Sequence, residues 1–247
     1  MQTTLSERYR LTALLGRGGM ADVYRADDLS LERPVAVKLL RTAAPDDARR
    51  FTAEARVLSR LNHEHVVRLF DAGVHEGVPY FVMQLVEGRS LRGLLAEGPL
   101  GAEEVRRIGV GLADALAHAH AFGIVHRDVK PGNVLVDAEG NVRLADFGIA
   151  RLADATRLTA TGSVLGTAAY AAPEQLRGDR LGPATDVYSM GLVLLEALAG
   201  RRDSAPTAVE TALSRLTRDP DIPEDVPAEW TSLLRALTAR APADRPD

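Results

Sequence analysis

The sequence predicts an α+β fold, with a strand-rich first third and a mainly helical remainder. Two patterns support this. Between residues 9 and 84, short apolar runs rich in β-branched side chains alternate with turn residues, as in antiparallel sheets. From residue 102 onwards, apolar side chains recur at the three- and four-residue spacing of helices. With 247 residues, of which 46% are hydrophobic, the chain can fill a sizeable core.

The first third is predicted to form a sheet of five strands. The runs lie at residues 9–15, 21–27, 35–40, 66–75 and 79–84. The glycine-rich stretch 16–20 would form the tip of the first hairpin, where glycines let backbone N–H groups approach phosphate oxygens. Taken alone, a glycine hairpin is more often only a turn. A helix is predicted at 46–61, because Phe51, Ala55, Leu58 and Leu61 recur at helical spacing.

The remainder is predicted to contain four longer helices and one hairpin. The helices lie at residues 102–120, 187–199, 207–216 and 228–238, and the hairpin at 134–144. The helix at 187–199 is apolar on most sides, which predicts burial. In the last helix, Trp230, Leu233, Leu234 and Leu237 are expected to share one face. Residues 151–170 are polar and lack periodicity, which predicts a loop.

Composition excludes several classes of function. A net charge of −4 without a basic run argues against a nucleic-acid partner. The absence of cysteine excludes disulfides and thiolate metal sites. The most apolar run, residues 190–199, is far shorter than the ~20 residues of a bilayer span. No membrane contact is therefore expected within this segment.

Residues 126–133, His-Arg-Asp-Val-Lys-Pro-Gly-Asn, concentrate the chemistry of the chain. Asp128 and Asn133 can face one site, because the proline and glycine between them favour a tight loop. Phosphoryl transfer needs a base beside the incoming hydroxyl, oxygen ligands for a divalent metal, and positive charge near the phosphoryl group. This segment contains all three, although its first three residues alone could equally form a solvated turn.

Lysine usage supports this interpretation. Only two of the 30 basic residues are lysines: Lys38, at the end of an apolar strand, and Lys130, within the segment 126–133. In a chain that otherwise uses arginine, a lysine indicates a position that needs a compact ammonium group.

At these residues the chain resembles the eukaryotic-like Ser/Thr protein kinases of bacteria. The segment 126–133 matches their catalytic loop, and Asp-Phe-Gly at 146–148 and Ala-Pro-Glu at 172–174 follow in the order that the family shows. The resemblance implies a two-lobed protein kinase fold. A small lobe of five strands and a helix (1–84) would precede a larger, mainly helical lobe (85–247), and ATP would bind between them.

The resemblance also implies roles for single side chains. Asp128 would accept the proton of a Ser or Thr hydroxyl, while Lys130 would steady the γ-phosphoryl group. Lys38 would hold the α- and β-phosphates, with Glu54 on the predicted helix as its partner.

ATP and Mg²⁺ are the implied cofactors, with Mn²⁺ as the alternative metal. Asn133 and Asp146 would supply oxygen ligands, which suit a hard cation. The family pattern has a glycine where this chain has Ala21, a difference expected to stiffen the glycine loop slightly. The implied ATP site comprises Leu15, Gly16, Gly18, Gly19, Val23, Ala36, Lys38, Met83 at the gatekeeper position, Gln84, Val86 and Leu135.

The polar loop at 151–170 would regulate the site. The resemblance implies that Thr159 and Thr161 are autophosphorylated. Arg127 would receive such a phosphate, because a guanidinium pairs with it in bidentate fashion and can order a loop. Thr167, like the catalytic-loop lysine, would favour Ser or Thr over Tyr as the acceptor.

Further expectations concern the helical part. Asp186 would anchor the catalytic loop, and Glu174 would pair with Arg245. The family usually has an aromatic Pro-Phe segment after Gly200, whereas residues 201–206 read Arg-Arg-Asp-Ser-Ala-Pro. The chain ends where a last helix would normally continue, so a shortened or truncated large lobe is expected.

The expected partners are proteins that carry Ser or Thr acceptors. A homodimer would allow trans-autophosphorylation, and the implied location is the cytoplasm, with a membrane tether outside this segment left open. Two other classes are weighed. A catalytically inactive pseudokinase would be expected to lack Lys38, Asp128 or Asp146, and all three are present. A small-molecule phosphotransferase would need neither Ala-Pro-Glu nor the Thr-rich loop.

Overall fold

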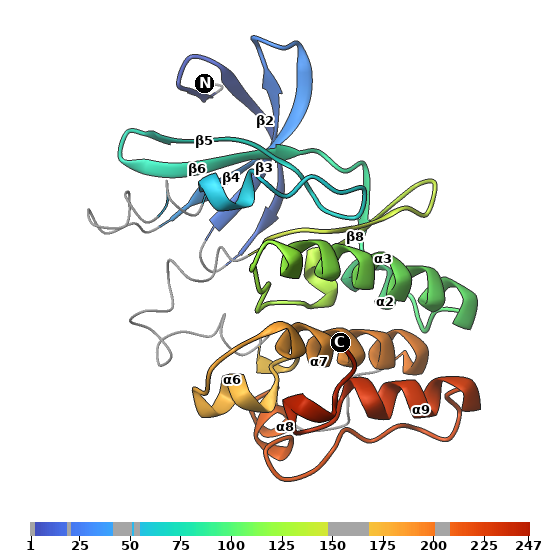
Figure 1. Ribbon diagram of the computed structural model, residues 1–247. Coiled ribbons are helices and arrows are strands. Elements are labelled where there is room, and N and C mark those ends of the chain that lie inside the picture. The colour runs from blue at the N-terminus through green and yellow to red at the C-terminus, as the bar shows by residue number, and fades with distance from the viewer. Residues whose placement is uncertain (1–2, 19–20, 42–50, 52–54, 148–167, 201–207) are drawn as a thin grey trace.

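The computed structural model describes residues 3–18, 21–41, 51, 55–147, 168–200 and 208–247. Figure 1 shows a sheet from the first third of the chain above a body of helices. This arrangement confirms the predicted α+β fold of a strand-rich part and a helical part.

The large sheet is antiparallel and has the strand order β1-β2-β3-β4-β6-β5. The strands are β1 (Thr4–Leu5), β2 (Tyr9–Arg17), β3 (Ala21–Asp28), β4 (Arg33–Leu40), β5 (Leu69–His75) and β6 (Val78–Gln84). The five predicted strands are present, and the two-residue β1 adds a sixth at the edge. β5 begins three residues later than predicted, because Val66 forms an isolated parallel bridge with Leu144 instead.

Both faces of this sheet are covered by apolar side chains. In β6, Tyr80 and Val82 join one buried cluster, whereas Phe81 and Met83 join another on the opposite face. This follows from the two-residue period of a strand, which sends successive side chains to opposite sides. The second cluster includes Phe51 and therefore reaches residues beyond the sheet.

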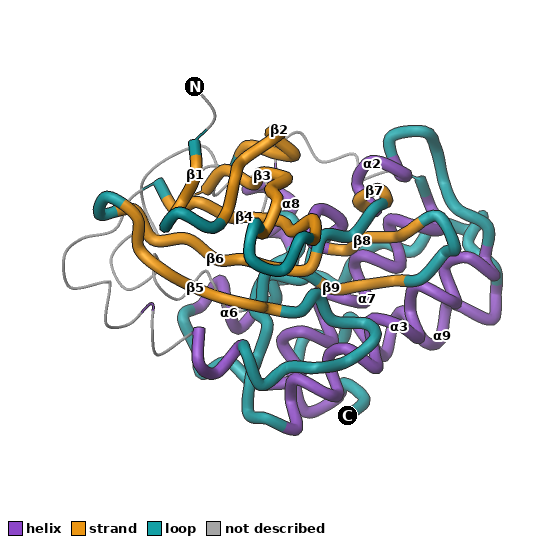
Figure 2. Tube along the Cα trace, turned by 90° about the horizontal axis from the view of Figure 1, so that it is seen from above, coloured by secondary structure: helices purple, strands orange, loops and turns teal. Residues whose placement is uncertain are grey.

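A small sheet joins the two parts of the chain. It has the order β7-β8-β9, from β7 (Gly88–Ser90), β8 (Val134–Asp137) and β9 (Val142–Leu144). The predicted hairpin at 134–144 is thus confirmed. Figure 2 shows this sheet beside the large one and over the helices. A Cβ at Gly88 would lie 2.2 Å from the carbonyl oxygen of Val136, so only glycine allows this approach of β7 to β8.

Helices make up most of the remainder. They are α2 (Leu91–Leu95), α3 (Ala102–Ala121), α6 (Pro173–Arg177), α7 (Pro183–Ala199), α8 (Ala208–Ser214) and α9 (Ala228–Leu237), with short 3₁₀ turns η1 (Pro131–Asn133) and η2 (Pro242–Asp244). The four longer helices that the sequence predicts here are present. α7 begins four residues earlier than expected, since proline is well suited to a first helical position. Of the helix predicted at 46–61, residues 55–58 are helical, whereas 46–50 and 52–54 lie outside the described residues.

One predicted face in α9 is wrong. Trp230, Leu234 and Leu237 are buried as expected, but Leu233 is 45% exposed. Leu233 is three residues from Trp230 and four from Leu237, but it lies at the margin of this stripe, about 100° round the helix from Leu234. The buried stripe packs against α7.

Within the described part of the chain, no helix combines the length and the apolar character needed to cross a lipid bilayer.

Two helical glycines test how tightly the helices pack. A Cβ at Gly191 of α7 would lie 2.8 Å from side-chain atoms of Leu237 and Thr238, whereas one at Gly109 of α3 would meet Leu194 at an ordinary 3.4 Å. We expect Gly191→Ala to lower the free energy of unfolding by roughly 1–3 kcal/mol through overpacking. Gly109→Ala, the matched control, should be neutral or stabilise by up to about 1 kcal/mol through helix propensity. Urea unfolding measures both, and equal effects would contradict the packing argument.

Candidate active site

The segment 126–133 folds as a tight loop, as its proline and glycine predict. Arg127 has a φ of 68°, in the left-handed region, and η1 closes the loop with a hydrogen bond from the Asn133 N–H to the Lys130 carbonyl. Pro131 occupies the first position of this turn, where the N–H that it lacks is not required. The loop therefore turns back on itself and brings Asn133 toward Asp128.

Three predicted site residues meet at one carboxylate oxygen. Lys130 Nζ lies 2.7 Å from Oδ2 of Asp128, and Asn133 Nδ2 donates to the same oxygen at 3.2 Å. Asn133 Nδ2 also donates to the backbone carbonyl of Asp128 at 2.8 Å. Since the amide nitrogen faces Asp128, the amide oxygen of Asn133 points away from it.

A second ion pair joins the large sheet to the segment after β9. Lys38 Nζ, on β4, lies 2.8 Å from Oδ1 of Asp146. Burial alone would raise the pKa of Asp146, but the Lys38 ammonium, with smaller contributions from His126 and Lys130, lowers it overall. The Asp146 carboxylate is thus held in its ionised form.

Asp186, in the first turn of α7, holds the backbone of the loop. Its two carboxylate oxygens accept the N–H groups of His126 at 2.8 Å and Arg127 at 2.7 Å. The predicted anchoring contact is therefore confirmed. His120, near the end of α3, also lies 2.8 Å from this carboxylate through Nε2. No local sequence signal indicates this contact, since 66 residues separate the two side chains.

His126 connects the loop to Phe147. The ring of His126 lies 4.6 Å from that of Phe147, and its Nε2 is 2.9 Å from the carbonyl oxygen of Ala145. An apolar pocket lies next to Phe147 and Asp146. It is lined by Leu58, Leu61, Val66, Val67, Leu69, Phe81, Met83, Asp146 and Phe147. Side chains from both parts of the chain therefore meet at this point.

Several of the residues expected around ATP are neighbours in the large sheet. Val23 stands opposite Lys38 and Gly16 in the strand register, and Ala36 stands opposite Met83. The turn of the glycine loop is closed by the N–H of Gly18, which donates to the Ala21 carbonyl at 2.8 Å.

The remaining expected ATP residues lie on neighbouring elements. Leu15, on β2, is 52% exposed, while Gln84 and Val86 are half-buried at the end of β6 and beyond. The Gln84 N–H donates to the Arg68 carbonyl at 2.9 Å, so this N–H is already occupied. Leu135 lies on β8 opposite Ser90 of β7.

Five residues predicted for the site lie outside the described part of the chain. They are Gly19, Glu54, Thr159, Thr161 and Thr167. Their roles stay predictions.

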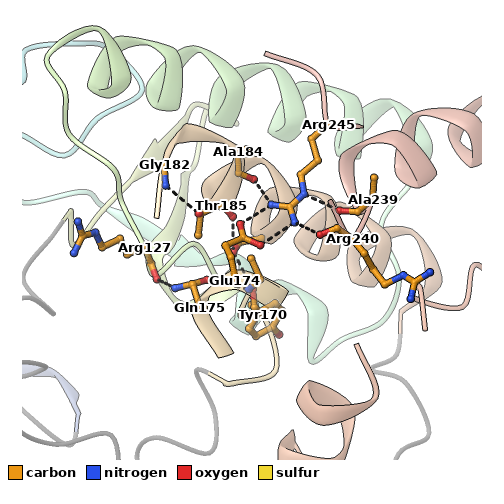
Figure 3. Close-up of polar contacts among 12 residues, drawn as sticks. Arg127, Tyr170, Glu174, Gln175, Gly182, Ala184, Thr185, Ala239, Arg240 and Arg245 are labelled. Atoms are coloured by element: carbon orange, nitrogen blue, oxygen red, sulfur yellow. Dashed lines mark hydrogen bonds and ion pairs between the residues drawn. The ribbon is translucent and has the colours of Figure 1, made fainter. Parts of the chain in front are cut away.

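A buried ion pair fixes α6 to the end of the chain, and Figure 3 shows its surroundings. Arg245 donates to both carboxylate oxygens of Glu174, at 2.6 and 2.9 Å, and to the carbonyls of Ala184, Ala239 and Arg240. The predicted pairing is confirmed. Burial alone would raise the pKa of Glu174, but the hydrogen bonds from Arg245 lower it overall.

Comparison with known proteins agrees with this geometry. A family model described as the protein kinase domain matches residues 9–247. The chain belongs to the protein kinase family. Its fold is similar to the kinase domain of PknI from Mycobacterium tuberculosis, with a TM-score of 0.78 and 28% identity, over 99% of this chain and 92% of that one.

The curated relatives are bacterial Ser/Thr protein kinases. This kinase domain is 41% identical to PknL and 42% identical to PknA of Mycobacterium tuberculosis, and 39% identical to PrkC of Bacillus subtilis, each over 98% of its length. It spans 63%, 59% and 39% of the length of those three relatives, respectively.

The Glu174–Arg245 pair should contribute strongly to stability. Arg245→Met leaves a buried carboxylate without its partner, which should lower the free energy of unfolding by about 3–5 kcal/mol. Since the folded state lowers the pKa of Glu174 from 4.5, the contribution of the pair is present above that pH and is lost as the pH falls. Urea unfolding at about pH 7 and about pH 4 should therefore show a smaller difference between variant and wild type at the acidic pH. An equal difference at both would contradict this role.

Proposed function

We propose that this kinase domain transfers the γ-phosphoryl group of ATP to Ser or Thr hydroxyls of proteins. The observation that carries the proposal is the meeting of Asp128, Lys130 and Asn133 at one carboxylate, together with the Lys38–Asp146 pair. A base, two ammonium groups and metal-binding oxygens are what phosphoryl transfer requires. The names of the three curated relatives support the choice of Ser and Thr as acceptors.

Asp128 is the proposed acceptor of the hydroxyl proton. Lys130 and Asn133 both contact its Oδ2, so they fix the carboxylate plane and leave the other oxygen to face an incoming hydroxyl. A base held in this way contributes roughly 10²- to 10⁴-fold to the rate. Lys130, already beside that oxygen, carries the positive charge that would steady the γ-phosphoryl group.

Asn133 and Asp146 fit a hard divalent cation. The amide oxygen of Asn133 points away from Asp128, and Asp146 is ionised, so both can offer oxygen ligands of the kind that Mg²⁺ takes. When bound, Mg²⁺ would offset the charge of the phosphate oxygens, and Mn²⁺ could use the same donors. Lys38 would move its ammonium to the α- and β-phosphates, with Glu54 as its partner.

Residues on β3 and β4 of the large sheet, and those at and after the end of β6, would hold the nucleotide. Val23 and Ala36 offer apolar side chains that would pack against the adenine from one side, with Leu135 on the other. The Gln84 carbonyl and the Val86 N–H would bind the adenine edge, and the glycine loop would cover the phosphates. The lobe boundary after residue 84 belongs to this proposal. So does a cytoplasmic location, because ATP is a cytoplasmic metabolite.

The alternatives receive less support. A pseudokinase that only binds partners does not require the contacts among Asp128, Lys130 and Asn133. A small-molecule phosphotransferase does not require the buried Glu174–Arg245 pair next to a Thr-rich loop.

Replacement of Asp128 tests the proposal. We expect Asp128→Asn to lower phosphate transfer from Mg-ATP to a generic protein acceptor by at least about 100-fold, because the amide cannot accept the proton. Phosphate is mapped by mass spectrometry, and calorimetry measures ATP binding, which should be retained. ATP binding without any transfer by the wild type would favour the pseudokinase, and transfer only to small molecules would favour the phosphotransferase.

We also propose that Thr159 and Thr161 are autophosphorylated, in trans within a homodimer, and that Arg127 receives the phosphate. Thr159→Ala with Thr161→Ala should then lower activity about tenfold, because a phosphate–guanidinium pair that orders the loop is lost. Serine at both positions is the matched control, since it keeps a hydroxyl that can be phosphorylated. Full activity of the alanine variant would count against regulation by this loop.

A further inference from the structure

Gln175 makes two hydrogen bonds that join α6 to the catalytic loop. Its Oε1 accepts from the N–H of Ala172 at 2.9 Å, and its Nε2 donates to the carbonyl of Arg127, also at 2.9 Å. Figure 3 shows the side chain extending from α6 to the Arg127 backbone. An amide side chain has one acceptor end and one donor end, so it satisfies both groups at once.

The Arg127 backbone is held from two sides. Its N–H donates to Asp186 at 2.7 Å, and its carbonyl accepts from Gln175. With a φ of 68°, it adopts the left-handed conformation that residues with a Cβ rarely take. A conformation of this kind persists only when surrounding contacts fix it.

The Arg127 carbonyl belongs to the same planar peptide unit as the Asp128 N–H. The orientation of that plane therefore sets the direction in which the Asp128 side chain leaves the loop. The Asp128 N–H itself faces Nδ1 of His126 at 3.2 Å, a longer contact than those on Arg127. The hydrogen bond from Gln175 is thus the shorter of the two contacts on this peptide unit.

We propose that Gln175 is a positioning residue for phosphoryl transfer, which orients Asp128 toward the acceptor hydroxyl by holding the Arg127–Asp128 peptide. The inference rests on the proposed function. The neighbouring Glu174 fixes α6 to Arg245, so α6 has a firm position from which Gln175 can act. Two adjacent side chains of one short helix thereby connect the end of the chain to the catalytic loop.

Gln175 could instead serve only to cap α6. Its bond to the Ala172 N–H is one half of a capping box, a contact that stabilises a helix start whatever the catalytic loop does. Two substitutions separate the roles. Gln175→Glu keeps the acceptor for Ala172 but presents an oxygen to the Arg127 carbonyl, whereas Gln175→Met has a similar length and lacks both groups.

Steady-state kinetics with Mg-ATP and a protein acceptor provide the test. We expect kcat to fall about tenfold in both variants, because a small displacement of the base slows transfer. KM for ATP should stay unchanged, and thermal unfolding should show that the Glu variant is fully folded at the assay temperature. Arg177→Ala, at the exposed end of α6, is the control and should keep full kcat. Hydrogen exchange of the peptide 126–133 should be faster in Gln175→Glu than in wild type.

Full kcat in the Glu variant would overturn the proposal, whatever the Met variant does, since capping alone would then explain Gln175. Unchanged hydrogen exchange of residues 126–133 would also overturn it. An inactive wild type would instead refute the proposed function, and the exchange measurement would still show whether Gln175 fixes the loop. The two failures are therefore distinguishable.

Discussion

The site depends on one buried carboxylate. Asp186, at the start of α7, accepts the N–H groups of two successive loop residues and has no solvent exposure. Charge-assisted hydrogen bonds in a buried setting are short and strong, so this pair fixes the path of the chain just before Asp128. α7 is itself buried on most sides against α3 and α9. A helix that is buried on most sides thus carries the group that shapes the catalytic loop.

Ion pairs then connect parts that the sequence keeps far apart. Lys38 on the sheet pairs with Asp146 after β9, and Arg245 near the chain end pairs with Glu174 on α6. The first pair is partly open to solvent. The second is buried and surrounded by carbonyls that accept further hydrogen bonds from Arg245. The second pair is therefore suited to structural support, whereas the first belongs to the proposed ATP site.

Much of the fold could be predicted from local patterns. The hairpin at 134–144 and the apolar stripe of α3 follow from periodicity, because the spacing of apolar side chains over a few residues shows which face of a strand or helix is buried. The errors arise where packing decides instead. β1 is too short to leave a pattern, and Leu233 of α9 is exposed although its spacing from Trp230 and Leu237 is helical. The reach of Gln175 to Arg127 could not be predicted, because it joins residues 48 apart in the chain.

The sequence by itself determined which chemical groups the molecule contains and their order: the loop 126–133, the two lysines of the chain, and the Asp-Phe-Gly and Ala-Pro-Glu segments. It also determined the local conformations that proline and glycine impose. Only the tertiary structure decided which of these groups meet. Asp186 and Gln175 act on Arg127 from opposite sides because α7 and α6 pack around the loop, and hydrogen bonds of 2.7 to 2.9 Å require a placement that spacing along a chain cannot specify.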